Sequence, residues 1–261
     1  DHLLTVNNDM SYELSYFKPY TKNTDALTDE KILDKLHTTI CQTYEKFLTH
    51  NTKPLKIFLS GGIDTTTNWA YLDKFTKNYE IVDYEYVKFT PFFKLNNVSL
   101  KQFWAYKQIH LWDESCVLVS GGMGDENLLR GPSTLAIALK KYDLELQDIL
   151  ESDDYHYKHF SKYLPDLYDS INNVYPTIKD IQEHILNTNV NDHQHWHIDK
   201  TITFTPLKDI ELLALVLNSS KELLVAQAKS GFINRQLISK LDPDKLNKIS
   251  YSKNNNMLAR L

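Results

Sequence analysis

Two short segments of the chain combine a Ser-Gly-Gly turn with acidic side chains. The first turn, Ser60-Gly61-Gly62, is followed by Asp64 and by three threonines at positions 65–67. The second turn, Ser120-Gly121-Gly122, is followed by the acidic pair Asp125-Glu126. Glycine lets backbone N–H groups approach a ligand closely, and a carboxylate can hold a divalent metal. Together these groups favour the binding of a phosphate chain with Mg²⁺.

The scarcity of glycine sets these turns apart from ordinary connections. The chain has only seven glycines, and six of them lie in or shortly after the two turns. Two strand-to-helix connections that merely need a positive φ would use the same residue type. In a chain so poor in glycine, the repeated pattern of apolar run, Ser-Gly-Gly and acid favours a ligand site instead.

The elements around the turns determine whether they can meet. Apolar runs at Leu55–Leu59 and at 116–119 lead into the turns and have the character of buried parallel strands. A helix-compatible segment follows the first turn at 68–75, strand character returns at 79–87, and helical spacing covers 99–112. This order predicts a parallel sheet with right-handed crossovers. Both turns would then lie at carboxyl ends of strands and could face one cleft.

Helical patterns flank this core. A capping pattern at Thr28 predicts an amphipathic helix to about His50, after an irregular arm or short hairpin over residues 1–25. Beyond residue 132 the pattern is helical throughout. The expected helices there cover 133–142, 144–150, 155–163, 177–186, 207–217, 221–229 and 232–241. We therefore expect an α/β fold in three parts, which are an N-terminal arm and helix (1–54), a nucleotide-binding core (55–132) and a helical part (133–261).

Three alternating histidines lie in the polar segment 187–205. Such spacing can place His193, His195 and His197 on one face of a strand, where they could bind a metal. No carboxylate or cysteine completes the set, so a solvent-facing loop or edge strand is the favoured interpretation.

Composition excludes several classes of protein. A formal net charge of −5 does not favour nucleic acid as the main partner, although a DNA or tRNA base stays open as a substrate. The two cysteines, Cys41 and Cys116, exclude a disulfide framework and a four-cysteine zinc site. No apolar run approaches the ~20 residues of a membrane span, and no signal peptide is visible. We expect a cytoplasmic protein with no membrane contact.

The first turn resembles the Ser-Gly-Gly-x-Asp-Ser pyrophosphate loop of the N-type ATP pyrophosphatases, with Thr65 in place of the last serine. The second turn and its acids resemble the second glycine-acid loop of the asparagine synthetase synthetase domain. The segment 205–212 resembles that domain's Pro-(hydrophobic)-x-Asp-x-Glu-(hydrophobic) segment, and Arg235 and Lys253 follow in the order of its C-terminal helices and phosphate-binding lysine. The resemblance implies a Rossmann-like parallel sheet of the PP-loop ATPase (adenine nucleotide alpha hydrolase-like) type, followed by a mostly helical C-terminal half.

The resemblance also implies a role for each matching residue. Asp64 and Asp125 would ligate Mg²⁺, and Lys253 would neutralise phosphate charge unless it is an ordinary surface lysine. Glu126 is the candidate for acid–base work, with a metal or structural role as the alternative. The residues implied in ATP binding are Leu59, Ser60, Gly61, Gly62, Asp64, Thr65, Thr66, Val87 and Gly121.

The implied activity is that of an ATP-dependent carbon–nitrogen ligase. It would adenylate a small carboxylate or amide, release pyrophosphate, and pass the acyl group to an amine or ammonia. Asparagine synthetases carry an acid where this chain has Gly122, so aspartate is not assumed as the substrate. Their N-terminal nucleophilic cysteine has no counterpart, because Cys41 falls inside an expected helix. The nitrogen would come from a separate glutaminase or amine-donor protein, or from an amine directly.

A second interpretation belongs to another class. The chain would be a non-catalytic ATP-binding subunit or scaffold of a larger biosynthetic or nucleic-acid-base-modifying complex. Gly122 in place of the family acid and the missing nucleophile domain both motivate it. Such a subunit would bind ATP without releasing pyrophosphate.

Overall fold

The computed structural model describes most of the chain outside two long central segments. The described residues are 2–6, 11–16, 27–59, 61–83, 115–130, 132–144 and 202–249, and, between 166 and 184, positions 166, 169, 173–178, 180, 181 and 184. Several expectations fall outside them. These are the end of the strand after residue 83, the helices at 99–112, 145–150 and 155–163, and His193, His195 and His197.

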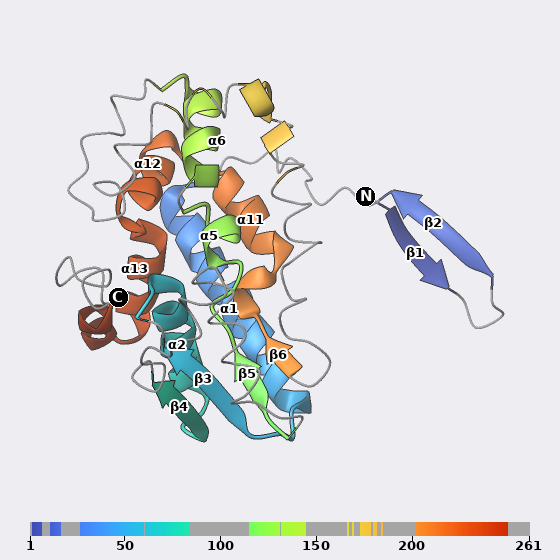
Figure 1. The fold of residues 1–261 in the computed structure, drawn as a ribbon, viewed down its shortest axis with the longest axis vertical. Helices are drawn as coiled ribbons and strands as arrows, with labels where there is room; N and C mark the ends of the chain where they lie inside the picture. The colour runs from blue at the N-terminus through green and yellow to red at the C-terminus, as the bar shows by residue number, and fades with distance from the viewer. Residues whose placement is uncertain are drawn as a thin grey trace, which may run out of the picture.

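A four-stranded parallel sheet carries the two turns (Figure 1). Its strands are β3 (Leu55–Leu59), β4 (Tyr79–Asp83), β5 (Val117–Val119) and β6 (Ile202–Phe204), in the order β4-β3-β5-β6. The expected α/β class and parallel sheet are confirmed. The chain passes from β3 outward to β4 and then returns to β5 on the other side of β3. The carboxyl ends of β3 and β5 therefore flank the point where ligands bind in open α/β sheets.

Strand β6 interrupts the otherwise helical pattern beyond residue 132, at the end of the segment 187–205 for which a loop or an edge strand was expected. It pairs in parallel with β5, with Val117 opposite Ile202 and Val119 opposite Phe204. The Ser120 N–H extends this pairing by donating to the Phe204 carbonyl at 2.9 Å. Three residues are too few to show a strand period in sequence, so the neighbouring strand rather than a local pattern explains β6.

The helices of the described part largely follow the expected pattern. They are α1 (Asp29–His50), α2 (Ile63–Phe75), α5 (Gly124–Asn127), α6 (Pro132–Tyr142), α11 (Ile210–Leu217), α12 (Lys221–Ser230) and α13 (Phe232–Leu241), with 3-10 helices η4 (Pro206–Lys208) and η5 (Pro243–Lys248). The N-terminal arm is a hairpin of β1 (His2–Val6) and β2 (Tyr12–Tyr16), which form a separate two-stranded antiparallel sheet. None of the helices in these ranges is long and apolar enough to cross a membrane.

Two helix starts show how local chemistry sets the boundaries. Thr28 caps α1 as expected, because its hydroxyl accepts a hydrogen bond from the Lys31 N–H at 3.4 Å. The expected single helix over 207–217 is instead divided. Asp209 has an extended backbone and accepts from the Glu211 N–H at 2.9 Å, so it ends η4 and begins α11.

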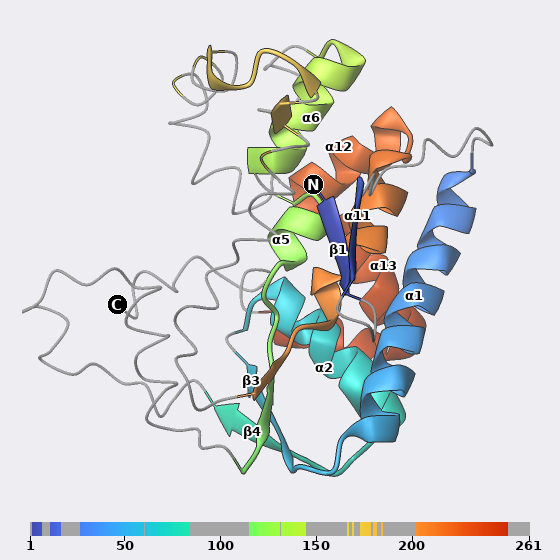
Figure 2. The same cartoon turned by 90° about the vertical axis from the view of Figure 1, so that its right-hand side faces the viewer.

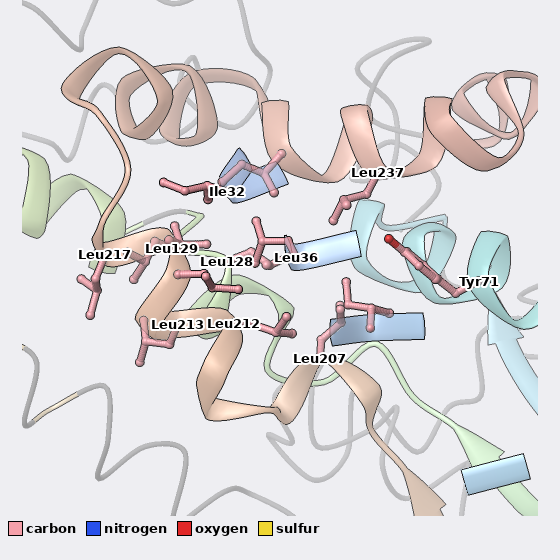
Figure 3. Close-up of a cluster of buried hydrophobic side chains, with 14 of the residues drawn as sticks. Ile32, Leu36, Tyr71, Leu128, Leu129, Leu207, Leu212, Leu213, Leu217 and Leu237 are labelled. Carbon is pink, nitrogen blue, oxygen red and sulfur yellow. The ribbon is translucent and has the colours of Figure 1, made fainter. Parts of the chain in front are cut away.

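One face of the long helix α1 forms part of the hydrophobic core. Figure 2 shows α1 and α2 on the same face of the sheet. Figure 3 shows Ile32 and Leu36 of α1 among leucines from several other elements. The buried Tyr44 hydroxyl of α1 donates to the Asn68 carbonyl of α2 at 2.9 Å. Each fully buried large apolar side chain contributes about 1.5–3 kcal/mol, so this core fixes α2 firmly against α1.

A charged cluster fastens η5 to the end of α2. The buried Lys245 ammonium donates to Asp73 Oδ2 at 2.8 Å and to Asp242 Oδ2 at 2.5 Å. It also lies 4.5 Å from the centre of the Trp69 ring. Burial acts to raise the pKa of Asp73, but hydrogen bonds from Lys245, Lys77 and Tyr79 outweigh it and hold that pKa well below its usual range.

This cluster makes the stability of the protein sensitive to acid. A carboxyl whose pKa is lowered by folding contributes stability above its unfolded pKa of about 3.9, and that contribution is lost as the pH falls toward its folded pKa. We expect Asp73→Asn to lower the free energy of unfolding by about 1 kcal/mol near neutral pH and to flatten its decline below about pH 4. Urea unfolding across this pH range measures both effects. The exposed Asp244 serves as a control, and an equal slope in Asp73→Asn and Asp244→Asn would contradict the expectation.

Candidate functional site

The first turn is a glycine corner that opens α2. Gly61 has a φ of 75°, in the left-handed region that favours glycine, and Gly62 is the N-cap residue. Helix α2 then starts at Ile63, earlier than the expected segment at 68–75. The i→i−4 ladder begins with the Thr66 N–H on the Gly62 carbonyl at 3.0 Å. The N–H groups of Ile63 and Asp64 precede that ladder, at the positive end of the helix dipole.

The three threonines explain the early start of the helix. Thr65 Oγ1 and Thr66 Oγ1 each donate to the Gly62 carbonyl at 2.9 Å, and Thr67 Oγ1 donates to the Ile63 carbonyl at 2.8 Å. These bonds brace the first turn of α2. Thr66 is buried, so its expected contact with phosphate would need a change in this arrangement. The phosphate-binding roles of Thr65 and Thr66 stay predictions.

The second turn is strained and firmly anchored. After Ser120, whose Oγ accepts from the Gly122 N–H at 3.1 Å, Met123 has a φ of 63°. A non-glycine residue in the left-handed region costs roughly 1–2 kcal/mol. The buried Asn127 anchors the turn by donating from Nδ2 to the Leu207 carbonyl at 2.8 Å. Strain of this kind persists where the surroundings hold the backbone, and it concentrates at functional sites.

The two turns are in direct contact, and glycine makes the contact possible. A Cβ at Gly121 would lie 2.8 Å from both the Cγ2 and the backbone N of Thr65. A Cβ at Gly124 would lie 2.5 Å from the Asp64 carboxylate, at both Cγ and Oδ1. The second turn and the start of α5 therefore pack directly on the first turn of α2. The structure thus brings together the acidic groups that the sequence placed in two separate segments.

An arginine joins the two aspartates. Arg130 Nη2 donates to Asp64 Oδ2 at 2.8 Å and also contacts Asp125 Oδ1. The side chains of Arg130 and Asp64 are only 12% and 14% exposed, whereas that of Asp125 is 55% exposed. We call this group the acid–arginine cluster. One guanidinium thus faces two carboxyl groups, of which Asp125 is the more exposed.

The electrostatics of the cluster oppose a negative charge on both carboxyl groups. Desolvation by the surrounding protein and the negative charge of Asp64 raise the pKa of Asp125, while Arg130 acts to lower it. The nearby Glu126 raises the pKa of Asp125 further. A second cation at this position would relieve the repulsion between the carboxylates.

A chain of buried amides holds the other side of Asp64. Asn234 Nδ2 donates to Asp64 Oδ1 at 3.1 Å and lies 3.2 Å from Thr67 Oγ1. Gln227 Nε2 donates to Asn234 Oδ1 at 3.0 Å and to the Leu128 carbonyl at 2.8 Å. Asn234 and Gln227 are fully buried. The chain of amides therefore connects α12 and α13 to both turns and fixes the orientation of the Asp64 carboxylate.

Sequence reasoning missed Arg130, Gln227 and Asn234. A signal existed for the two amides, because each falls in an otherwise apolar helical stripe, where a polar side chain needs a partner. The only sequence signal for Arg130 was its position shortly after the acidic pair of the second turn. The corner between α12 and α13 also carried a signal in its lone glycine. Gly231 has a φ of 65°, and a Cβ there would lie 2.8 Å from Ile63 Cδ1.

The remaining expected site residues divide into two groups. Leu59 ends β3 beside the first turn, and Glu126 lies partly buried in α5 next to Asp125. Ser60, Val87 and Lys253 lie outside the described residues, so their expected roles stay predictions. The resembling segment at 205–212 lies against the second turn, because Thr205 Cγ2 would be 3.4 Å from a Cβ at Gly122.

The donor chemistry of the cluster fits Mg²⁺ together with a phosphate ligand. Carboxylate oxygens are the hard ligands that Mg²⁺ prefers, and this ion commonly uses one or two of them along with substrate phosphates. Among the described residues there is no group of three or more His, Cys, Asp or Glu side chains that could hold a metal. Asp64 and Asp125 could therefore hold the ion only with oxygens from a bound substrate or solvent.

Comparison of the chain with models of known protein families, with curated proteins and with solved structures found no match. The class of the site therefore depends on its residues and their geometry.

The glycines of the site offer a matched pair of variants. We expect Gly124→Ala to lower the free energy of unfolding by about 1–2 kcal/mol, because the clash with the Asp64 carboxylate outweighs the helix propensity gained. Gly122→Ala is the control, since its Cβ would meet Ser120 Oγ and Thr205 Cγ2 only at 3.4 Å. Denaturant unfolding of both variants measures the difference. Equal stability of the two would show that the turns are not packed as described.

Proposed function

We propose that the chain is an ATP-dependent, AMP-forming carbon–nitrogen ligase of the asparagine synthetase-like, PP-loop type. It would adenylate a carboxylate or amide, release pyrophosphate and transfer an amine or ammonia. The observation that carries the proposal is the meeting of Asp64 and Asp125 at the carboxyl ends of two neighbouring parallel strands. A Rossmann-like PP-loop fold belongs to the same proposal, supported by the parallel sheet and the glycine turn before α2.

The phosphates of ATP would lie at the start of α2. Gly61 and Gly62 present no side chain there, and the first N–H groups of the helix favour an anion. The second turn closes one side of this position through the contact of Gly121 with Thr65. Leaving pyrophosphate gains negative charge, so donors held in place by a rigid core lower the barrier without reorganising.

Asp64 and Asp125 would hold Mg²⁺, which neutralises charge on the phosphates when it is bound. Asp64 is held for this role from two sides, by Asn234 at Oδ1 and by Arg130 at Oδ2. Arg130 supplies a second positive charge beside the phosphate position, and its planar guanidinium suits phosphate oxygens as well as carboxylates. Glu126 is the proposed proton-transfer group, because it lies next to Asp125 on the same short helix.

The acceptor would lie near Gly122, where asparagine synthetases carry an acid. Gly122 is exposed, and a Cβ there would touch Ser120 Oγ and Thr205 Cγ2 at 3.4 Å, so these two side chains would border the acceptor. Because Gly122 carries no charge, this position fits a carboxylate or amide substrate that lacks an amino group. The acid of asparagine synthetases would bind such an amino group. The nitrogen donor would be a small amine, ammonia, or a separate glutaminase.

One observation favours the alternative of a non-catalytic ATP-binding subunit or scaffold. Arg130 already pairs with both aspartates, so the cluster is satisfied in part without a metal. The hydroxyls of Thr65 and Thr66 also donate inside the helix rather than toward a ligand position. A scaffold would use this arrangement to bind nucleotide and hold it.

Pyrophosphate release separates the two functions. The chain is incubated with ATP, Mg²⁺ and mixtures of small carboxylates, amides and amines, and pyrophosphate, AMP and adenylated species are measured. The ligase gives AMP and pyrophosphate in equal amounts with at least one mixture. ATP binding without pyrophosphate under every mixture supports the scaffold, and release of ADP with inorganic phosphate excludes cleavage between the α and β phosphates.

A further inference from the structure

One buried glutamine is bonded to neighbours of both halves of the acid–arginine cluster. Gln227 lies in α12 and is fully buried. Its Nε2 donates to Asn234 Oδ1 at 3.0 Å and to the Leu128 carbonyl at 2.8 Å. Its Oε1 accepts from the Ile233 N–H at 2.7 Å. The nitrogen and the oxygen of this amide are therefore both engaged inside the protein.

Two backbone groups fix which way the amide of Gln227 points. A backbone N–H can only donate and a carbonyl oxygen can only accept, so Ile233 must face Oε1 and Leu128 must face Nε2. Turning the amide over would place its oxygen against the Leu128 carbonyl and its nitrogen against the Ile233 N–H. Buried polar groups left without a partner in this way are costly. The backbone at the end of α5 and in α13 therefore sets the orientation of Gln227.

The fixed glutamine in turn determines the orientation of Asn234. Because Gln227 presents an N–H, Asn234 must offer its Oδ1 there, which leaves Nδ2 to face Asp64 and Thr67. Thr67 agrees with this direction, because its hydroxyl gives its own proton to the Ile63 carbonyl and accepts from Asn234. The N–H that Asp64 Oδ1 receives is therefore directed by a side chain one step further into the core.

The same glutamine also holds the end of the second turn. Leu128 is the C-cap residue of α5, and Leu129 follows it with a φ of 52°, in the left-handed region. This reversal brings the Arg130 N–H onto the Asp125 carbonyl at 2.9 Å, and the Arg130 guanidinium also contacts the Asp125 carboxyl group. The bond from Gln227 to the Leu128 carbonyl fixes the backbone at this point. Gln227 thus supports both aspartates of the cluster through separate neighbours.

We propose that Gln227 is a positioning residue that sets the geometry of the metal site from a distance. It acts on Asp64 through Asn234, and on the segment that carries Asp125 through the Leu128 carbonyl. The proposal rests on the proposed function, in which the two aspartates hold Mg²⁺. Groups that orient metal-binding side chains commonly change metal affinity by about 10–100-fold when they are substituted. A glutamine that only stabilised the core would not act selectively on the metal.

Binding of an ATP analogue separates these two roles without any turnover. The probe is α,β-methylene-ATP, which is not cleaved between its α and β phosphates. Its Kd is measured by calorimetry, once with Mn²⁺ and once with a chelator. In Gln227→Met we expect the Kd with Mn²⁺ to rise at least about tenfold, and the Kd in chelator to change by less than about twofold. Methionine keeps the length of the side chain but removes its three hydrogen bonds.

Gln227→Glu tests the direction of the bonds and keeps one that Gln227→Met loses. Glutamate at this position still accepts from the Ile233 N–H, but it presents an oxygen to Asn234. The amide of Asn234 would then turn over and place its own oxygen against Asp64 Oδ1. We therefore expect Gln227→Glu to raise the Kd with Mn²⁺ at least as much as Gln227→Met, although glutamate is closer to glutamine in shape.

Tyr44→Phe is the matched control, because it removes a buried hydrogen bond to the Asn68 carbonyl of α2 and keeps the ring. It should leave both Kd values unchanged. Unchanged Kd values in both Gln227 variants, or an equal rise with and without Mn²⁺, would overturn this proposal alone. If Mn²⁺ does not improve binding of the analogue to the wild-type chain, the metal site itself is contradicted, and this proposal fails with it.

Discussion

Asp64→Asn is expected to reduce pyrophosphate release at least about 100-fold, which corresponds to roughly 3 kcal/mol of lost transition-state stabilisation. Asparagine keeps the size of the side chain, and its carbonyl can still accept the bond from Asn234 that now ends on Asp64 Oδ1 at 3.1 Å. What is lost is the negative charge that would bind Mg²⁺. Pyrophosphate release under the best substrate mixture measures the effect.

The fold should survive this substitution. Asp64→Asn removes the contact with Arg130, because the asparagine Nδ2 replaces Oδ2 and cannot accept from Arg130 Nη2. It leaves the helix start and the packing on Gly124 in place, so we expect about 1–2 kcal/mol of destabilisation. Thermal unfolding of the variant checks that the loss of activity is not a loss of structure. Asp34→Asn is the matched control, because Asp34 is an exposed carboxylate of α1 paired with Lys240. Turnover at the wild-type level in Asp64→Asn would refute the metal role.

The sequence could predict those parts of the site that depend only on residues close together in the chain. An apolar run, two glycines and an acid define a strand, a corner and a helix start, because each residue type constrains the backbone at its own position. Thr28 marked the start of α1 in the same way. The placing of both turns at the carboxyl ends of strands then followed from the rule for parallel sheets.

The parts that the sequence could not predict depend on contacts between distant residues. Arg130 and Asp64 are 66 positions apart, and Asn234 and Asp64 are 170 apart. No local pattern tells an arginine that joins two aspartates from one that lies in solvent. Strand β6 is another such case, since its three residues form a strand only because β5 offers an open edge. The early start of α2 was missed for a different reason, because threonine is a weak helix former whose back-bonding to Gly62 and Ile63 is not visible in sequence.

The combination of local and distant contacts explains why the site can be rigid. Asp64 is fixed by the helix start below it, by Gly124 packed against it, and by Asn234 and Arg130 on its two oxygens. A carboxylate with so many fixed neighbours loses little freedom when it binds a ligand. Such preorganisation is what electrostatic catalysis requires, since the charged groups need not reorganise as pyrophosphate leaves.

Arg130→Met is expected to lower the free energy of unfolding by about 3 kcal/mol when divalent metal is removed by a chelator. Methionine fills much of the space of the arginine stem, so the loss comes mainly from Asp64, which loses its charged partner. Asp125, whose pKa is already raised, is protonated more readily without Arg130. Millimolar Mg²⁺ should restore part of this loss, because the ion can take the place of the guanidinium. At ten times its dissociation constant, bound Mg²⁺ would return about 1.4 kcal/mol.

Two comparisons make this result specific to the acid–arginine cluster. Without nucleotide, the wild-type chain should respond little to Mg²⁺, since Arg130 already pairs with both aspartates. Arg235→Met is the matched control, because the Arg235 Nε donates to the Ser230 carbonyl at 2.8 Å and lacks an aspartate partner among the described residues. Urea unfolding of the three proteins in chelator and in Mg²⁺ gives the full set of differences. If Mg²⁺ fails to stabilise Arg130→Met more than Arg235→Met, the two aspartates do not form a metal site. The proposed ligase activity would then lack the Mg²⁺ site that it requires.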